Sequence, residues 1–151
     1  MNRPAAIATG AVLLLGSALA AQAQEKVSDG VVKIGMLEDM GSIYADITGV
    51  GAVTAAKMAV EDFGGKALGK PIEIVAADHQ NKPDIASATA RKWFDTGHVD
   101  ALMDVAASAT ALAAIDVAKS KNKIVVLNGP GAARITNEAC TPISVHYTYD
   151  N

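Results

Sequence analysis

Apolar residues along the chain alternate between short β-branched runs and longer stretches with helical spacing. The short runs are typical of buried strands, because Val and Ile dominate them and turn-forming residues border them. They cover residues 31–37, 71–77, 99–105, 123–128 and 143–149. This pattern predicts five strands.

The segments between the first four predicted strands show helical spacing. The first predicted helix has an apolar stripe and a glycine stop, formed by Val50, Val53, Val60 and Phe63 and then by Gly64 and Gly65. Two further helices are expected over 84–95, after Pro83, and over 109–121, with Ser108 as the N-cap.

Regular alternation of strand and helix with short connections predicts crossover connections and a mostly parallel sheet covered by helices on both faces. The expected fold is therefore an α/β three-layer sandwich. Ligands of such sheets bind beyond the carboxyl ends of the strands. The loops after the first four predicted strands are thus the candidate site.

The first 23 residues are expected to be an export signal. Arg3 precedes an Ala-, Leu- and Val-rich run over residues 5–21, and Ala21-Gln22-Ala23 has the small-x-small pattern that signal peptidase recognises. The run is short and interrupted by glycine and serine, which argues against a membrane anchor. Cleavage after Ala23 would leave residues 24–151 as one exported domain.

Composition and charge narrow the function classes. Half of the residues are apolar and 19% are charged, which is the balance of a soluble globular domain. The 13 basic and 16 acidic residues give a net charge of −3, or −4 without Arg3, which argues against a nucleic-acid partner. Cys140 is the single cysteine of the sequence, so we expect a buried thiol or one half of a pair whose partner lies elsewhere.

Two apparent catalytic motifs fail on mechanism. GGKALGK, residues 64–70, fits the phosphate-loop spacing but leads from a helix into a strand, which is the wrong order, so we expect a turn. None of the three histidines has the spacing of a triad or metal site. His79 follows the second predicted strand and is interpreted as a polar loop residue or a supporting contact. The alternative is a small exported hydrolase that uses Ser108 and His79.

Three loops offer ligand contacts. Ala107, Ser108 and Thr110 lie at the amino end of the third predicted helix, where free N–H groups and the helix dipole attract a carboxylate, although Ser108 can also serve only as a cap. The loop with Gly131 and Ala132 has an accessible backbone whose carbonyls could receive an ammonium or hydroxyl group.

The third loop, LEDMGSIYADITG over residues 37–49, connects the first predicted strand to the first helix. Tyr44 is its expected ligand contact, through the ring or the hydroxyl, with Met40 and Ser42 as neighbours. Glu38 and Asp39 are expected to be solvated at the rim.

After the leader, the chain carries in order VKIGMLEDMGSIYADITG, AAKMAVEDFGG, LGKPIEIVAADHQNKPDIA, RKWFD, DVAASATALAA, KNKIVV and ITNEACTPISVHYTYD. In this order the segments resemble the amino-terminal part of the branched-chain amino acid type periplasmic substrate-binding proteins of ABC importers. The resemblance implies the first lobe of a type I periplasmic binding protein, which closes like a hinge on a small solute.

The resemblance also implies a function in binding rather than catalysis. It implies a periplasmic component that binds a small amino acid, amide or aromatic carboxylate and delivers it to ABC permease subunits, without a metal or cofactor. The implied contacts are Ala107, Ser108 and Thr110 on a ligand carboxylate, with Tyr44, Gly131 and Ala132 lining the cleft.

Two departures from the family pattern affect these expectations. Relatives often carry a serine or asparagine where this chain has Ala107, and the alanine removes one side-chain hydrogen bond to the ligand. Family members are also more than twice as long and have a second lobe that supplies the other cleft wall. We therefore expect an incomplete binding protein, from a truncated or split reading frame.

Overall fold

The computed structural model describes residues 28–151, so the expected export signal and its cleavage site lie outside the described residues. The strands are β1 (Val32–Glu38), β2 (Lys66–Ala67), β3 (Lys70–Asp78), β4 (Ala101–Met103), β5 (Ile124–Leu127) and β6 (Ser144–His146). The helices are α1 (Gly49–Asp62), α2 (Pro83–Asp95) and α3 (Ser108–Lys121), with short 3-10 helices η1 (Ser28–Gly30) and η2 (Ala133–Ile135). No helix in this part of the chain is long and apolar enough to cross a membrane.

The strands form one mixed sheet in the order β2-β3-β1-β4-β5-β6. All neighbouring pairs are parallel except β2 and β3, which form an antiparallel hairpin. The predicted α/β fold with a mostly parallel sheet is therefore confirmed. The hairpin turns at Leu68 and Gly69, both with positive φ, inside the segment that resembles a phosphate loop. The segment is therefore a turn between a helix and a strand, as predicted from its position after the first helix and before the second predicted strand.

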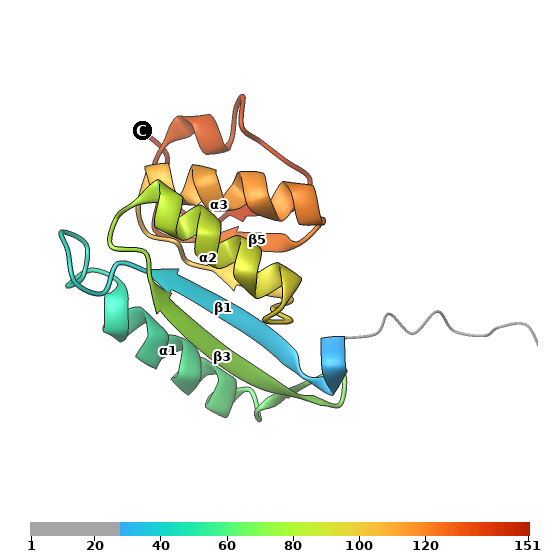
Figure 1. Ribbon diagram of the computed structural model, residues 1–151. Coiled ribbons are helices and arrows are strands. Elements are labelled where there is room, and N and C mark those ends of the chain that lie inside the picture. The colour runs from blue at the N-terminus through green and yellow to red at the C-terminus, as the bar shows by residue number, and fades with distance from the viewer. Residues whose placement is uncertain (1–27) are drawn as a thin grey trace, which may run out of the picture.

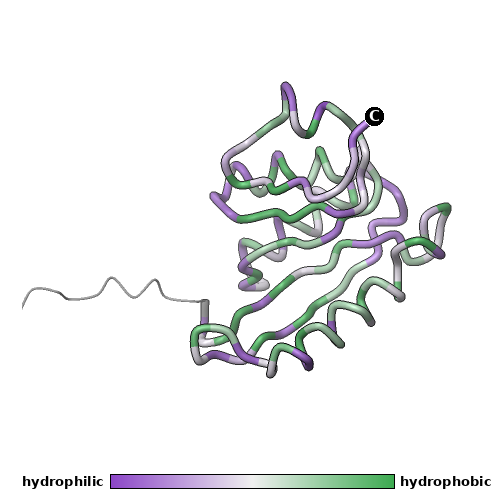
Figure 2. Tube along the Cα trace, turned by 180° about the vertical axis from the view of Figure 1, so that it is seen from behind, coloured by the Kyte–Doolittle hydropathy of each residue, from purple (hydrophilic) through white to green (hydrophobic). Residues whose placement is uncertain are grey.

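The helices cover both faces of the sheet, as predicted (Figure 1). α1 packs against β1 and β3 on one face, while α2 and α3 pack against each other and against β1 and β5 on the other face. The main apolar core lies on the α2–α3 side and includes Leu37, Leu102, Ile115, Val125 and Leu127. Apolar stretches run through the sheet, and polar positions are distributed over the helices and the connecting loops (Figure 2).

Three positions that were expected to be buried are exposed. On the predicted stripe of α1, Val53 is buried, but Val50 and Phe63 are 64% and 70% exposed. α1 lies over the edge half of the sheet, so only a narrow line of its residues meets β1 and β3. Cys140 is also exposed, which contradicts the expected buried thiol, because it lies in the irregular segment between η2 and β6.

The predicted strand boundaries differ most where the backbone turns. The strand expected over 99–105 is reduced to β4, because Asp104 and Val105 adopt left-handed φ values of 71° and 55° that end the extended ladder. The strand expected over 143–149 is reduced to β6, which pairs with β5 only over three residues. The early end of β4 brings Asp104 into the loop that precedes α3.

Candidate functional site

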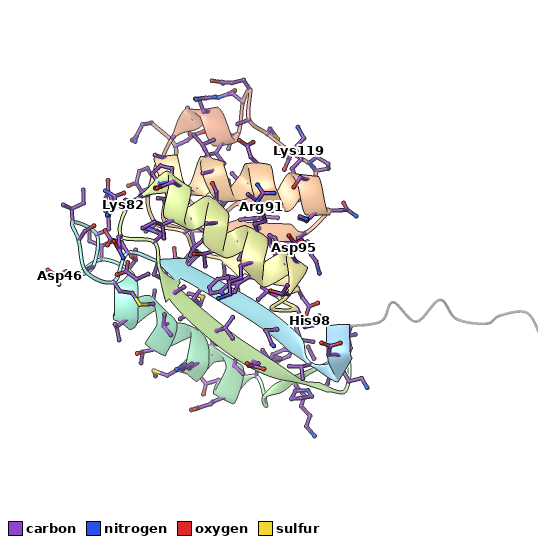
Figure 3. All side chains as sticks on the ribbon, in the orientation of Figure 1. Asp46, Lys82, Arg91, Asp95, His98 and Lys119 are labelled. Carbon is purple, nitrogen blue, oxygen red and sulfur yellow. The ribbon has the colours of Figure 1, made fainter. Side chains whose placement is uncertain are left out.

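The carboxyl ends of β3, β1, β4 and β5 meet at one edge of the sheet, because these strands are parallel neighbours. Figure 3 shows Asp46 and Lys82, from the loops after β1 and β3, at this edge, and His98 at the opposite edge. The strand order places the β1–α1 loop beside the β4–α3 loop, which in turn neighbours the loop after β5. All candidate residues from the sequence therefore lie on adjoining loops or, like Ser108 and Thr110, in the first turn of α3.

Asp39 organises the β1–α1 loop from within. It is fully buried, whereas the sequence predicted a solvated position at the rim. Its carboxylate accepts hydrogen bonds from the N–H of Ser42 (2.8 Å), the N–H of Tyr44 (3.1 Å) and the Ser42 hydroxyl. Burial opposes ionisation of Asp39, but the Ser42 hydroxyl and the N–H groups of Tyr44, Ser42 and Gly41 outweigh it and lower the pKa. An ionised Asp39 thus fixes Ser42 and the half-buried Tyr44.

Asp78, the last residue of β3, connects the two neighbouring loops. Its Oδ1 accepts the N–H of Met40 in the β1–α1 loop (3.1 Å) and the N–H of Gln80 in its own loop (2.7 Å). Because carboxylate acceptors make strong hydrogen bonds to N–H groups, these two bonds hold the start of the β1–α1 loop against the end of β3.

His79 is fully buried behind these loops. Its Nδ1 accepts the N–H of Asn81 (2.9 Å), and its Nε2 has no hydrogen-bond partner among the described residues. Burial lowers the pKa of the imidazole, although the charges of Asp39 and Asp78 act to raise it. A neutral, covered ring agrees with a supporting contact rather than with an exposed base.

The hydrolase alternative finds no support in this arrangement. Ser108 lies after β4 and His79 after β3, and β1 separates these two strands. No hydrogen bond joins the two side chains. Nδ1 of His79 accepts the N–H of Asn81, and Nε2 has no partner among the described residues. A Ser–His pair would need the hydroxyl and the ring within hydrogen-bond reach.

The other two histidines have structural contacts. His98 Nδ1 lies 3.2 Å from Asp29 Oδ2 at the edge of the sheet opposite the candidate site. His146 Nε2 lies 2.6 Å from the carbonyl oxygen of Pro130 and so supports the loop after β5. Both contacts are structural, and neither histidine lies in an arrangement typical of a triad or metal site.

The amino end of α3 differs from the prediction in one detail. Ala107 occupies the N-cap position in extended conformation and Ser108 is the first helical residue, so the prediction of Ser108 as N-cap is wrong. The buried Thr110 hydroxyl donates to the Ala107 carbonyl (2.7 Å), whose oxygen also accepts the N–H of Ala111 (2.8 Å). The first N–H groups of a helix lack intrahelical partners. The half-exposed Ser108 hydroxyl therefore stands beside N–H groups that can receive an anion.

The loop after β5 is partly closed by the end of the described chain. The Gly131 carbonyl accepts the N–H of Asn151 (2.9 Å), and a Cβ at Gly131 would lie 2.9 Å from Tyr149 Cε2. Ala132, the next residue, is half-buried at the start of η2. A side chain at position 131 would therefore require the exposed Tyr149 ring to shift.

Two buried acids lie at this edge: Glu38, for which the prediction of a solvated position is wrong, and Asp104, which sequence reasoning missed. Glu38 is fully buried and Asp104 is 4% exposed, and the Glu38 oxygens and Asp104 Oδ1 have no hydrogen-bond partner among the described residues. Burial, and then the charge of Asp104, raise the pKa of Glu38 to about 8. Burial likewise raises the pKa of Asp104. The alternation of side chains along β1 could have indicated the burial of Glu38, because Glu38 lies on the same side of the strand as Met36.

Over residues 28–151 no group of three or more histidine, cysteine or acidic side chains is placed to hold a metal ion. The polar groups at this edge are instead backbone N–H groups, hydroxyls and acids, of which Glu38 and Asp104 have raised pKa values. Such groups can bind a small polar solute by hydrogen bonds, and no nucleophile–base pair stands among them.

Comparison with known proteins gives a consistent result. A family model described as "Periplasmic binding protein" matches residues 31–151. A periplasmic binding protein from Burkholderia mallei is 55% identical with a TM-score of 0.77, and the match covers 80% of this chain and 32% of that chain. None of the curated proteins matches.

Two further solved structures extend the comparison. A branched-chain amino acid ABC transporter periplasmic ligand-binding protein from Burkholderia xenovorans is 44% identical, with a TM-score of 0.76 over 79% of this chain and 32% of that chain. A solute-binding protein from R. palustris in complex with benzoate is 26% identical, with a TM-score of 0.69 over 79% and 32%. This chain spans about a third of the length of these proteins.

Proposed function

This chain belongs to the periplasmic binding protein family, and we propose that it supplies one wall of the ligand cleft in a solute-binding component of an ABC importer. The proposed location is the periplasm, and the proposed partners are the permease subunits that receive the solute. Binding without catalysis is the proposed role, since the site contains hydrogen-bonding groups and no paired nucleophile and base.

The proposed ligand is a small amino acid, amide or aromatic carboxylate. The observation that carries this proposal is the amino end of α3, where Ser108 and free N–H groups lie beside the loop that holds Tyr44. A carboxylate is stabilised there by the hydrogen bonds and by the positive end of the helix dipole. The relative from R. palustris, which was solved with benzoate, supports a carboxylate.

Each candidate residue takes a role that matches its exposure. Ser108 and the backbone from Ala107 onward would bind the carboxylate, and Tyr44 and Ser42 would contact the rest of the solute from the neighbouring loop. Gly131 and Ala132 would line the far side. Thr110 and His79 are fully covered, so we propose that they shape the loops from beneath.

Isothermal titration calorimetry tests the proposal. The titrants are benzoate, benzamide and L-leucine. The proteins are the 151-residue chain and a chimera in which residues 31–151 replace the matched part of the Burkholderia mallei protein, with that parent protein as reference. We expect the chimera to bind at least one titrant. The 151-residue chain should bind the same titrant more weakly or not at all, because a single cleft wall leaves the ligand exposed to water. Absence of heat for the whole panel in both proteins would contradict the proposal.

A matched pair of serine variants locates the site. Ser108→Ala should weaken binding of the titrant roughly tenfold or more, since a hydrogen bond to a charged group contributes about 1.5–3 kcal/mol. Ser120→Ala, on the last turns of the same helix, should leave the affinity unchanged, because the Ser120 hydroxyl bonds only to the Val117 carbonyl. Equal effects of the two variants would place the ligand elsewhere.

A further inference from the structure

Two unpaired acids lie directly beneath the proposed ligand loops. Glu38 ends β1 and Asp104 follows β4, and these strands are parallel neighbours through the pair Met36 and Met103. None of the ion pairs among the described residues includes either acid. Buried polar groups without partners are rare in folded proteins and call for a physical explanation.

Glu38 and Asp104, here called the acid pair, are located where four loops meet. The Glu38 carbonyl accepts the N–H of His79 from the loop after β3 (2.8 Å). The Asp104 N–H donates to the Val126 carbonyl of β5 (2.9 Å). A Cβ at Gly129 would lie 3.0 Å from Asp104 Oδ1, so the loop after β5 packs closely on this carboxyl.

The backbone beside the acid pair is strained. Asp104 and Val105 are consecutive residues with left-handed φ values, and this conformation is unfavourable for a β-branched residue such as valine. Strain of this kind persists only where surrounding contacts enforce it, and it concentrates at binding and switch regions. The conformation leads directly into Ala107 and the amino end of α3.

The groups that face the Glu38 carboxyl come from three elements. Asp104 contributes a negative charge from the β4–α3 loop, where Val105 also offers its N–H, and Thr48 offers its hydroxyl from the start of α1. The N–H and the hydroxyl favour the ionised form, but neither makes a hydrogen bond of good geometry to Glu38, and the Thr48 hydroxyl donates to the Tyr44 carbonyl instead (3.3 Å). Asp39, the adjacent residue, is occupied by its own loop, and the covered His79 ring is neutral. Among residues 28–151 no ion pair balances an ionised Glu38.

We propose that Glu38 retains its proton in the binding-competent protein and that the acid pair, with one negative charge at most, sets the spacing of the β1–α1 and β4–α3 loops. Ionisation of Glu38 then places two like charges in one buried site and forces these loops apart. This inference rests on the proposed function, because those loops carry Tyr44 and Ser108.

The consequence for an anionic ligand is a linkage between ligand and proton. A carboxylate at the amino end of α3 adds a negative charge near Asp104, which disfavours ionisation of Glu38 further. Linkage is reciprocal, so the proton on Glu38 strengthens carboxylate binding by the same factor. Affinity for a carboxylate therefore falls as the pH rises past the Glu38 transition, whereas a neutral amide is less affected.

A direct test follows the Glu38 carboxyl by carbon-13 NMR in the full chain between pH 4 and pH 10. Glu38→Gln identifies the signal, and the exposed Glu61→Gln serves as the control. We expect a midpoint near 8 for Glu38, and a lower midpoint in Asp104→Asn, which removes the neighbouring charge. A Glu38 midpoint near 4.5, the ordinary value, would overturn the inference whether or not a ligand binds.

A second test measures benzoate affinity of the chimera at pH 7 and pH 9. With a midpoint near 8, the affinity should be about tenfold weaker at pH 9, because about nine tenths of Glu38 is then ionised. Glu38→Gln should remove the difference, and Glu61→Gln should keep it. The same fall in Glu38→Gln would overturn the inference. If benzoate gives no heat at any pH, the proposed site loses its support, and the NMR midpoint alone decides the state of the acid pair.

Discussion

Replacement of Glu38 by glutamine should change how the folding stability of the chain depends on pH. The folded protein holds a proton on Glu38 up to about pH 8, whereas an unfolded glutamate releases it near 4.5. Between these values the folded state binds more protons than the unfolded state, so rising pH lowers the free energy of unfolding. Glutamine cannot ionise, and this part of the pH dependence should therefore disappear in Glu38→Gln.

The magnitude follows from the size of the shift. A pKa raised from 4.5 to about 8 corresponds to roughly 3.5 pH units. At about 1.4 kcal/mol per unit, the loss between pH 4.5 and pH 8 is at most of order 5 kcal/mol. Structural relaxation around the ionised acid reduces this value. The difference in the free energy of unfolding between Glu38→Gln and the wild type should therefore grow steadily from pH 4.5 to pH 8. Above pH 8 this difference should stay constant.

Urea denaturation of both proteins at half-unit pH steps measures this difference. Trp93 is the single tryptophan and is half-buried against Gly35, so its fluorescence reports unfolding. His79 has a lowered pKa and so contributes the opposite trend, in which stability is lost as the pH falls below about 6.5, but it is present in both proteins and cancels in the difference. A flat difference curve between pH 5 and pH 8 would refute the buried neutral Glu38.

Two further predictions concern packing and loop order. Asp39→Asn should destabilise the chain by about 1–2 kcal/mol, because the anionic acceptor of three hydrogen bonds is lost. Amide hydrogen exchange in the β1–α1 loop should also become faster. Unchanged exchange at the Ser42 amide would contradict this prediction. Gly35→Ala should cost about 1–3 kcal/mol, because the new methyl group would lie 2.7 Å from ring atoms of Trp93. Gly51→Ala, which meets no atom within 4 Å on exposed α1, is its control and should be neutral or slightly stabilising in urea denaturation.

Several features of this protein could be predicted from the sequence because they depend on neighbouring residues. The short β-branched runs at 71–77 and 123–128 became β3 and β5, and Gly64 and Gly65 end α1 with positive φ as expected. Strand period, helix period and glycine stops are set within about 15 residues of chain. They fixed the order of elements, the mostly parallel sheet and therefore the edge at which the candidate loops meet.

Burial of the individual side chains at that edge depended on contacts between distant segments. Glu38 and Asp39 follow an apolar run, and their sequence suggests a solvated loop, yet both are fully buried. Glu38 faces Thr48 at the start of α1 and Asp104 in the loop after β4, which are distant in the sequence. Val50 occupies a helical stripe and is nevertheless exposed, because the strand order leaves α1 over only part of the sheet. Local periodicity shows which face of an element is apolar. Only the tertiary structure decides what covers that face, and it thereby determines which acid is ionised, which is neutral and which loop they hold.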